Sequence, residues 1–537
     1  MNNLLKIEDC FNRYHIRDGD VERLSALEKT RRTVYERALD EAVESLNLAP
    51  EKLVCIREIH LAVSLNLSRS THSQAGTWSE CIAQEIRRLL TQGDAGSVLQ
   101  FQSRGHAWIE CSKSVVAGDL SASWAWQQIG LLGYDLVDSP ENAVDRWIEG
   151  LCTDPAYVLP VMSALKDHAM FANLCLRITD RDWTALLMAL SRQAAHDLTH
   201  IVTACAEQRA QQYIQVQFTK PAVQSRAKSS QLLSIPRTVM PAQTMSPGTQ
   251  CTVALILIAT TDPGFLIRRA SEIKKGVLRY LESVEISADA NVGDEGLDIL
   301  TLDACAPSTD QKTTGLTETR TVTECDDFIV KQGESQSFVH PDTVVDSSES
   351  AAQPANHYYD NTPSVYSDDR QRATSRYGGL LFLLNLMGHP TGLCDQLASD
   401  DVFADRPMRW IWYWLGRSLV PADPGDCALL AFSGLAPNYD HTELDRISPG
   451  TEQKAVLQSA AQLLEAHACD RLALAGMQTP VALQTVFRRR AAIVVDPGWI
   501  ECEFSLSDVD TAVRRAGLDL DPEYLPWLGW VVRFSYA

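Results

Sequence analysis

The chain ends, over residues 498–537, with GWIECEFSLSDVDTAVRRAGLDLDPEYLPWLGWVVRFSYA. Large apolar residues alternate with polar ones in its first part, which is the period-two pattern of a half-buried strand: Ile500, Cys502, Phe504 and Leu506. The alternation returns at the end, in Trp530, Val532, Phe534 and Tyr536. Between them, a helix N-cap with an acidic first turn (Ser507, Asp510) and Gly517 predict a short helix whose apolar face is Val509, Ala512, Val513 and Ala516. The stretch therefore predicts a strand, a helix and a strand.

A second unit of the same order is predicted over residues 59–102. Every odd position from Ile59 to Leu67 is large and apolar, which predicts a half-buried strand. A polar loop over residues 68–76, a helix over residues 78–90 and a short strand over residues 97–102 follow. One hypothesis is that the two units pack together into one sheet-containing body.

Helical periodicity dominates the remaining folded regions, including an amphipathic helix over residues 24–46. The sequence therefore predicts an α+β fold that is predominantly α-helical, with small strand-helix-strand units near both ends and long disordered linkers. Five segments are expected: an N-terminal α/β then helical domain (1–206), a basic flexible linker (207–250), a short helical segment (251–283), an acidic disordered linker (284–372) and a C-terminal helical domain that ends in the strand-helix-strand unit (373–537).

Charge is concentrated in the predicted linkers. The 537 residues carry a net charge of −21, and the segment from Glu282 to Arg372 alone has 19 acidic and 5 basic residues. No Asp or Glu occurs over residues 208–261. An acidic excess of this origin argues against general nucleic-acid affinity. The sequence also lacks a signal peptide and any apolar run of about 18 residues, so we expect no membrane span and a cytoplasmic protein.

The sequence contains few candidates for catalysis or for cofactor binding. Fourteen cysteines without a CxxC pair are expected to be reduced thiols packed as small hydrophobes. His196 and His200 would share one helix face and could bind zinc, but Asp197 stands where a metalloprotease has its general-base Glu. Phosphate-binding and nucleophile-elbow motifs are missing. We therefore expect a non-enzymatic protein without cofactor or metal, and a metal-dependent hydrolase using His196 and His200 remains the alternative.

A candidate interface lies in the last forty residues. Its residues are charged or aromatic and close in sequence: Arg514, Arg515, Asp519, Asp521, Tyr524, Trp527 and Trp530. The charged members are typical either of an intramolecular ion-pair cluster or of a docking surface. Aromatic residues beside a turn, with arginines nearby, are typical both of an interface hot spot and of a lid over a core. The sequence leaves these alternatives open.

Three stretches of the chain resemble one family. The C-terminal parts Gly498–Leu506, Arg514–Pro522 and Leu525–Phe534 look like the C-terminal signature of large accessory proteins encoded in bacterial extracellular contractile injection system clusters, which specify phage-tail-like particles. Residues 101–126 (Phe101–Arg104, Ala117–Asp119, Trp124–Trp126) and Gly378–Leu384 resemble the same proteins, and the segment that starts at Ile56 is similar to the start of the tape-measure family of these systems.

The resemblance implies a non-enzymatic role in building or regulating such a particle. The protein partners that it suggests are the baseplate, the tube, the sheath or the assembly ATPase. A tape-measure protein should contain long continuous helices that span a tube, whereas this sequence predicts short helices and two linkers. We therefore expect a structural or assembly factor, with a tape-measure-like component of the particle as an alternative.

Overall fold

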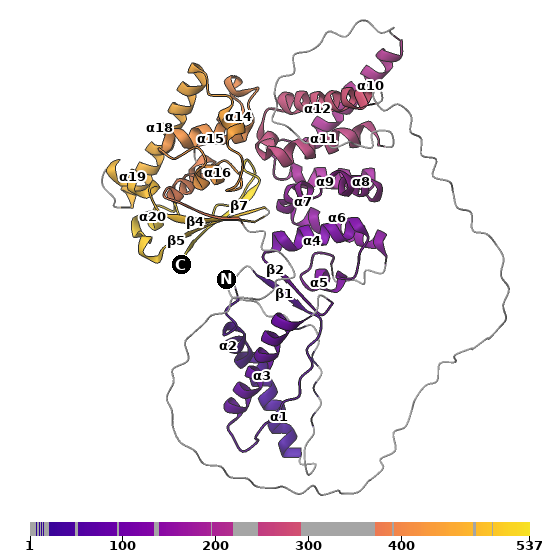
Figure 1. Cartoon of the computed structure of the whole chain (residues 1–537), viewed down its shortest axis with the longest axis vertical. Helices are drawn as coiled ribbons and strands as arrows, with labels where there is room; N and C mark the ends of the chain where they lie inside the picture. Colours follow the sequence, from indigo (N-terminus) through magenta and orange to yellow (C-terminus); the bar gives the residue numbers. More distant parts are fainter. Residues whose placement is uncertain are drawn as a thin grey trace, which may run out of the picture. The chain divides into compact units, whose positions relative to one another are not determined.

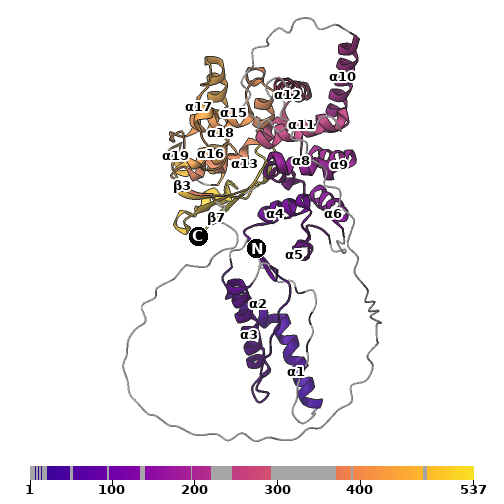
Figure 2. The ribbon, with the colours of Figure 1, turned by 45° about the vertical axis from the view of Figure 1, so that its right-hand side comes forward.

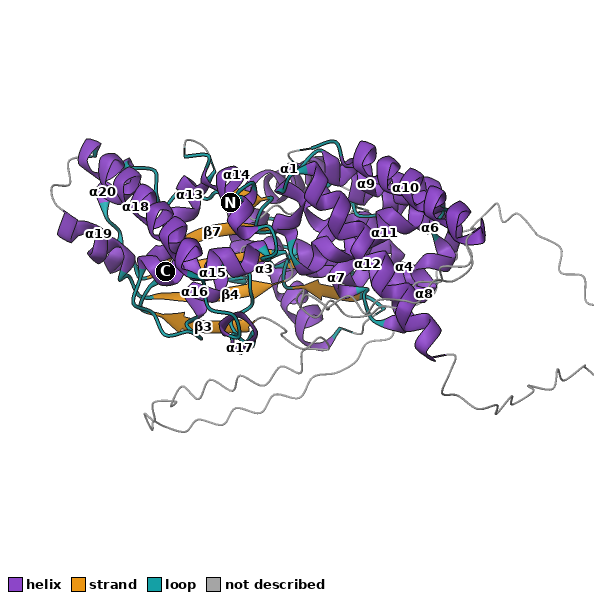
Figure 3. Cartoon of the chain, turned by 90° about the horizontal axis from the view of Figure 1, so that it is seen from above, coloured by secondary structure: helices purple, strands orange, loops and turns teal. Residues whose placement is uncertain are grey.

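The computed structural model describes residues 21–48, 52–93, 96–133, 139–194, 196–218, 245–291, 371–388, 391–475, 480–496 and 498–537, with single residues at 7, 10, 12 and 14. Helices predominate and the strands form two small sheets, so the predicted α+β, predominantly α-helical class is confirmed (Figures 1 and 3). Most of the two predicted linkers, residues 219–244 and 292–370, lies outside the described residues. No helix among the described residues is long and apolar enough to cross a membrane.

The first described helices form an N-terminal arm. A helix with a π-helical middle, made of α1 (Val21–Thr33), η1 (Val34–Ala38) and α2 (Leu39–Glu44), lies beside α3 (Thr71–Gln92), as Figure 2 shows for α1 and α3. Among the described residues, its core has five buried apolar members: Val34, Ala38, Leu39, Ala75 and Trp78. The predicted loop over residues 68–76 is shorter than expected, because the Ser70 side chain caps α3 by accepting a hydrogen bond from Ser73 N–H.

A two-stranded antiparallel sheet follows the arm. Strand β1 (Leu53–Ile56) pairs with β2 (Val98–Phe101), and Leu53 lies opposite Phe101. The prediction of a strand over residues 97–102 is confirmed within one residue at each end. The predicted strand over residues 59–67 is wrong: the paired residues come before it, and residues 58–66 are in no strand. The period-two pattern gives a tendency to extend but supplies no partner strand.

A helical body comes next. Its elements are α4 (Arg104–Ala117), α5 (Ser123–Gln128), α6 (Pro140–Thr153), η2 (Pro155–Tyr157), α7 (Val158–Ala164), α8 (His168–Arg177), α9 (Asp180–Ser191), α10 (Leu198–Phe218), α11 (Pro247–Thr261), η3 (Pro263–Ile267) and α12 (Ala270–Asn291). Eleven of the fifteen residues of α11 are buried, so residues 251–283 belong to this core. Helix α10 runs past residue 206 to Phe218, where Ala, Gln and Glu residues favour helix, and α12 runs past residue 283 to Asn291.

The C-terminal region combines helices with a five-stranded sheet. Its helices are η4 (Gly378–Leu383), α13 (Leu384–Met387), α14 (Leu393–Ala398), η5 (Asp401–Phe403), α15 (Met408–Leu419), α16 (Cys427–Phe432), α17 (Thr442–Asp445), α18 (Thr451–Leu474), α19 (Pro480–Phe487), η6 (Leu506–Asp508) and α20 (Thr511–Arg515). Its strands are β3 (Gln371–Ser375), β4 (Ala491–Asp496), β5 (Trp499–Phe504), β6 (Glu523–Leu525) and β7 (Trp530–Tyr536), in the order β3-β4-β5-β7-β6. The predicted strand-helix-strand ending is confirmed as β5, α20 and β7, with β6 added.

The two sheets stay separate. Strands β1 and β2 form one sheet and β3 to β7 form the other, so the two terminal units do not pair their strands with each other. Both sheets nevertheless belong to one compact unit, which combines Met1–Ala290 with Ser364–Ala537. Strand β5 is parallel to β7, and the inward side chains of β5, Ile500, Cys502 and Phe504, contribute to the C-terminal core.

Candidate functional site

The predicted interface residues lie on α20, β6, β7 and the turns between them (Figure 1). Asp519 is only 2% exposed. Its carboxylate accepts hydrogen bonds from the Tyr536 hydroxyl at 2.8 Å and from Arg514 Nη1 at 3.5 Å. Burial and the hydrogen bond to Asp519 raise the pKa of Tyr536. These three side chains therefore tie the turn after α20 to the last strand of the chain.

The aromatic residues of the candidate interface are half-buried. Trp530 Nε1 donates to the carbonyl oxygen of Gly434 at 3.1 Å, and the Trp527 ring lies beside Gly388. Burial raises the pKa of the Tyr524 phenol. Trp527 and Trp530 thus pack over the C-terminal core, which is the arrangement expected of a lid.

Two of the remaining members are on the surface. The exposed Asp521 uses its Oδ1 to accept the backbone N–H of Phe534 at 2.8 Å, at the edge of β7 beyond its pairing with β6. Arg515 is exposed and has no hydrogen-bond or ion-pair partner within the part of the chain that the structure describes. Arg515 is therefore the member of the predicted set that is most available to a partner.

Sequence reasoning missed three exposed apolar residues in the same unit. Leu506 is 66% exposed, Val509 52% and Leu520 51%. Alternation placed Leu506 on the buried side, but β5 ends at Phe504. Val509 was expected on the apolar face of the helix, but Asp510 caps α20 by accepting the N–H of Ala512, so Val509 precedes the helix. We call Leu506, Val509, Arg515 and Leu520 the exposed terminal residues.

The stretches that carry the family resemblance meet in the fold. The Phe382 ring centroid lies 5.0 Å from those of both Phe504 and Phe534, so Gly378–Leu384 packs against β5 and β7. The hydroxyl of Ser103, at the start of α4, donates to the carboxylate of Asp496 at the end of β4. Residues 378–384 therefore contact residues 498–534, and Ser103 contacts Asp496, which pairs with Trp499 at the start of β5.

A short segment joins the two cores at what we call the junction, residues 262–268 together with residues 401–409. Leu266 belongs to the core of the helical body and Ile267 to the C-terminal core. The Asp262 carboxylate accepts the N–H of Met408 at 2.9 Å. It thereby caps α15, whose preceding residue, Pro407, offers no side-chain cap.

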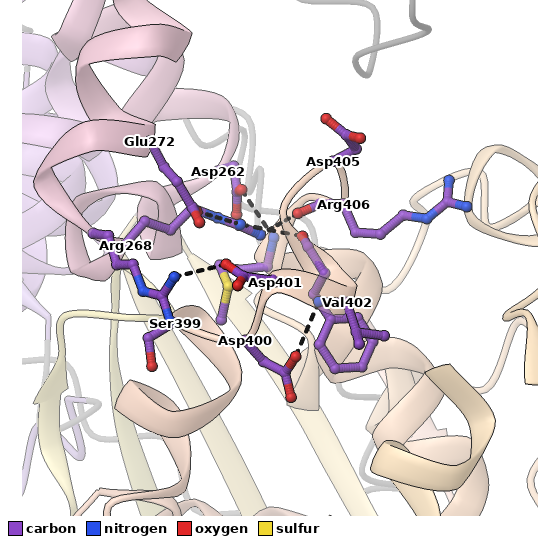
Figure 4. A network of polar contacts seen from close by, with 12 residues as sticks. Asp262, Arg268, Glu272, Ser399, Asp400, Asp401, Val402, Asp405 and Arg406 are labelled. Carbon is purple, nitrogen blue, oxygen red and sulfur yellow. Dashed lines mark hydrogen bonds and ion pairs between the residues drawn. The ribbon is translucent and has the colours of Figure 1, made fainter. Parts of the chain in front are cut away.

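Arg268 is the main cation of the junction. It is 3% exposed, and its Nη1 donates to Glu272 Oε2 at 3.0 Å and to the carbonyl oxygen of Phe403 at 3.2 Å. Its Nη2 donates to the carbonyl oxygen of Arg406, so one guanidinium holds the last residue of η5 and the connection that leads from η5 to α15 (Figure 4). The neighbouring Arg269 pairs with Asp401 at 2.6 Å, but both side chains are exposed.

Burial dominates the electrostatics of the junction. It raises the pKa of Asp262, while the charges of Arg268 and Arg409 and the N–H of Met408 act in the opposite direction. Burial likewise lowers the pKa of Arg409. Oδ1 of Asp262 and Nε of Arg409 have no hydrogen-bond partner among the described residues. The junction is therefore a structural joint with closely balanced charges, in which each charged group depends on its neighbours.

The histidine pair does not have the predicted geometry. Helix α10 begins at Leu198, and Asp197 accepts the N–H of Thr199 at 3.0 Å just before it. His196 precedes the helix and His200 lies in its first turn, so the expectation that they share one helix face is wrong. The described part of the chain contains no group of three or more His, Cys, Asp or Glu residues placed to hold a metal ion.

Buried and partly buried thiols are in surroundings that keep them protonated. Burial raises the pKa of Cys111, and it raises the pKa of both Cys175 and Cys427 to about 12. A thiolate is the reactive form of cysteine, so these side chains act as packing groups. The expectation of cysteines packed as small hydrophobes is confirmed for these residues.

Comparison with protein-family models, with curated proteins and with solved structures finds no match for the chain.

Proposed function

We propose that the protein is a non-enzymatic structural or assembly factor of a contractile, phage-tail-like injection machine, and that it acts in the cytoplasm through protein–protein contacts. The observation that carries this proposal is the meeting of residues 101–104, 378–384 and 498–534 in one folded unit. A family that shares these segments would also share the packing between them. Their contact supports a resemblance that extends to the fold.

Helix lengths favour an assembly factor over the tape measure itself. Helix α18 has 24 residues and is therefore about 36 Å long, and no described helix is longer. It packs against α15 and α19 and contributes Leu457, Leu464 and Leu472 to a globular core. A tape-measure protein that spans a tube would need longer continuous helices that do not pack into a globular core.

The exposed terminal residues are the docking surface that we propose for a particle component. Leu506, Val509 and Leu520 offer exposed apolar surface that a partner would bury, and Arg515, close to them in sequence, is a residue type enriched in binding hot spots. The internal cluster of Arg514, Asp519 and Tyr536 holds the turn that presents Leu520. The expected partner is a baseplate, tube, sheath or assembly-ATPase subunit with an apolar patch beside an acidic group.

The test is capture of partners by the full chain, tagged and expressed at native level. We expect particle subunits in the eluate of the wild type and their loss from Leu520→Asp and Arg515→Glu. Met188→Asp is the matched control, because Met188 on α9 is a similarly exposed apolar residue at 58%. Circular dichroism should show that all three variants stay folded. Absence of any particle subunit from the wild-type eluate would refute the proposed function, and equal capture by Leu520→Asp and the control would refute the proposed surface.

A further inference from the structure

Residues 59–67 have the sequence pattern of a strand, but residues 58–66 are in no strand. Among the described residues, the backbone of residues 58–65 makes no hydrogen bond. The flanking backbone is bonded: Arg57 N–H donates to Ser97 at 2.9 Å, and Arg69 N–H donates to Asn66 at 3.1 Å. Backbone groups of an extended segment are normally paired in a sheet, and an unpaired edge is a template for another strand.

The side chains of this segment are covered unevenly. Val63 and Leu65 pack against the core of the N-terminal arm, whereas Ile59 and Leu61 on the same side are each 37% exposed. The even positions, His60, Ala62, Ser64 and Asn66, are exposed. One half of the apolar face therefore has a cover of helices and the other half has none.

We propose that a second copy of this chain pairs with residues 59–67 as an antiparallel strand, with the twofold axis at Val63. The alternation of apolar and polar residues is symmetric about Val63, so apolar residues of the two copies face each other and polar residues face polar ones. Leu61 would face Leu65 and Ile59 would face Leu67 on the apolar side, while Ala62 would face Ser64 on the polar side. A slip of one residue would place apolar side chains opposite polar ones, so the alternation fixes the register.

The uneven cover favours a second copy over an unrelated strand. In the antiparallel arrangement, the exposed Ile59 and Leu61 of one chain would lie opposite residues 65–67 of the second chain. The N-terminal arm of the second chain partly covers those residues. Each arm would thus complete the cover that the other lacks, as an isologous interface requires. Pairing would also enlarge an arm core that, among the described residues, has five buried apolar members, two of them alanines.

Charge at the ends limits the length of the pairing. Residues 59–67 carry no Asp, Glu, Lys or Arg, so no like charges face each other within the nine-residue ladder. Arg57 and Arg69 would meet just beyond its ends, where like charges disfavour further pairing. Like charges therefore end the pairing near residues 59 and 67, close to the ends of the unbonded stretch 58–65.

The first test measures the mass of the full chain in solution by light scattering after size exclusion, over a range of concentrations. We expect about twice the chain mass of 59.5 kDa, and the mass of one chain for Ala62→Pro, because proline removes a backbone donor from the ladder. A wild type that stays monomeric at all concentrations would overturn the proposal. The proposal would be overturned in the same way if the segment bound a strand of another protein and the chain stayed monomeric.

The second test fixes the register without disturbing the backbone. Val63→Cys places two thiols opposite each other on the axis, where facing Cβ atoms of antiparallel strands lie about 4.5–5.5 Å apart. Asn66→Cys is the matched control, because its twin would lie about 20 Å away along the strands. Mild oxidation should give disulfide-linked dimers from Val63→Cys well above the level of the wild type, which supplies the background of its own thiols. Equal yields from the two variants would refute this interface even if the chain is a dimer.

Discussion

Replacing Arg268 with alanine should destabilise the protein far more than the same change at Arg269. The two residues are adjacent, and both reach from the α11–α12 connection to η5. Arg268→Ala leaves the Phe403 and Arg406 carbonyl oxygens without their donor. It also removes the cation beside the Glu272 carboxylate, whose side chain is 17% exposed, and one of the charges that offset the burial of Asp262.

The burial of each arginine and of its partner sets the size of the expected loss of stability. Removing one partner of a buried, hydrogen-bonded charge pair costs about 3–5 kcal/mol, because the remaining charge stays buried without compensation. The pair of Arg269 and Asp401 has side chains that are 49% and 83% exposed, so its loss should cost about 0–1 kcal/mol. The expected difference between the variants is therefore about 2–5 kcal/mol.

The assay is urea denaturation of the wild type and both variants, followed by tryptophan fluorescence and far-ultraviolet circular dichroism. Tryptophans are buried in both cores, so fluorescence reports on each. Limited proteolysis gives a second readout, because loss of the Arg268 contacts should expose residues 262–272 to cleavage. If the free energies of unfolding of the two variants agree within about 1 kcal/mol, the junction does not depend on Arg268 in the way argued above.

Three further predictions follow from packing, ionisation and burial. Gly379→Ala should destabilise by about 1–3 kcal/mol or more, because its Cβ would overlap a backbone carbonyl, whereas Gly76→Ala, with open space in α3, should stabilise by about 0.5–1 kcal/mol in the same urea assay. Because the pKa of Asp262 is raised in the folded state, its contribution to stability is complete below the unfolded-state pKa of about 4 and is lost as pH rises through the folded-state pKa. The stability of Asp262→Asn relative to the wild type should therefore increase from pH 4 to 7. The absence of such a trend would refute the assignment. Thiol labelling of the native protein should be fast at the exposed Cys10. It should be limited by unfolding at seven buried cysteines: Cys55, Cys111, Cys205, Cys251, Cys394, Cys427 and Cys502. Rapid labelling of these seven would contradict the fold.

The local sequence pattern was sufficient to predict an element where that element depends on residues close together in sequence. The alternation of Ile500, Cys502 and Phe504 predicts β5, and Asp510 predicts the start of α20, because both depend on side chains within a few residues. The junction could not be predicted in this way. Asp262 looks like the end of a helix, and its partner Met408 lies 146 residues further along the chain. Pairing at that separation is decided by tertiary packing.

The failed strand prediction for residues 59–67 is informative for a different reason. The pattern predicts a chain that is half-buried and paired, and the single copy supplies half of the cover but no pairing. A local preference that one chain leaves unsatisfied points to a contact outside that chain.

The two proposed surfaces should act together if both exist. A dimer through residues 59–67 would carry two sets of exposed terminal residues, and two linked contacts on one multi-subunit particle bind more tightly than one through effective concentration. Ala62→Pro should then weaken capture of particle subunits although it leaves Leu520 and Arg515 unchanged. Met188→Asp should leave both dimerisation and capture intact. Full capture by a monomeric Ala62→Pro protein would mean that the terminal surface binds its partner without help from dimerisation.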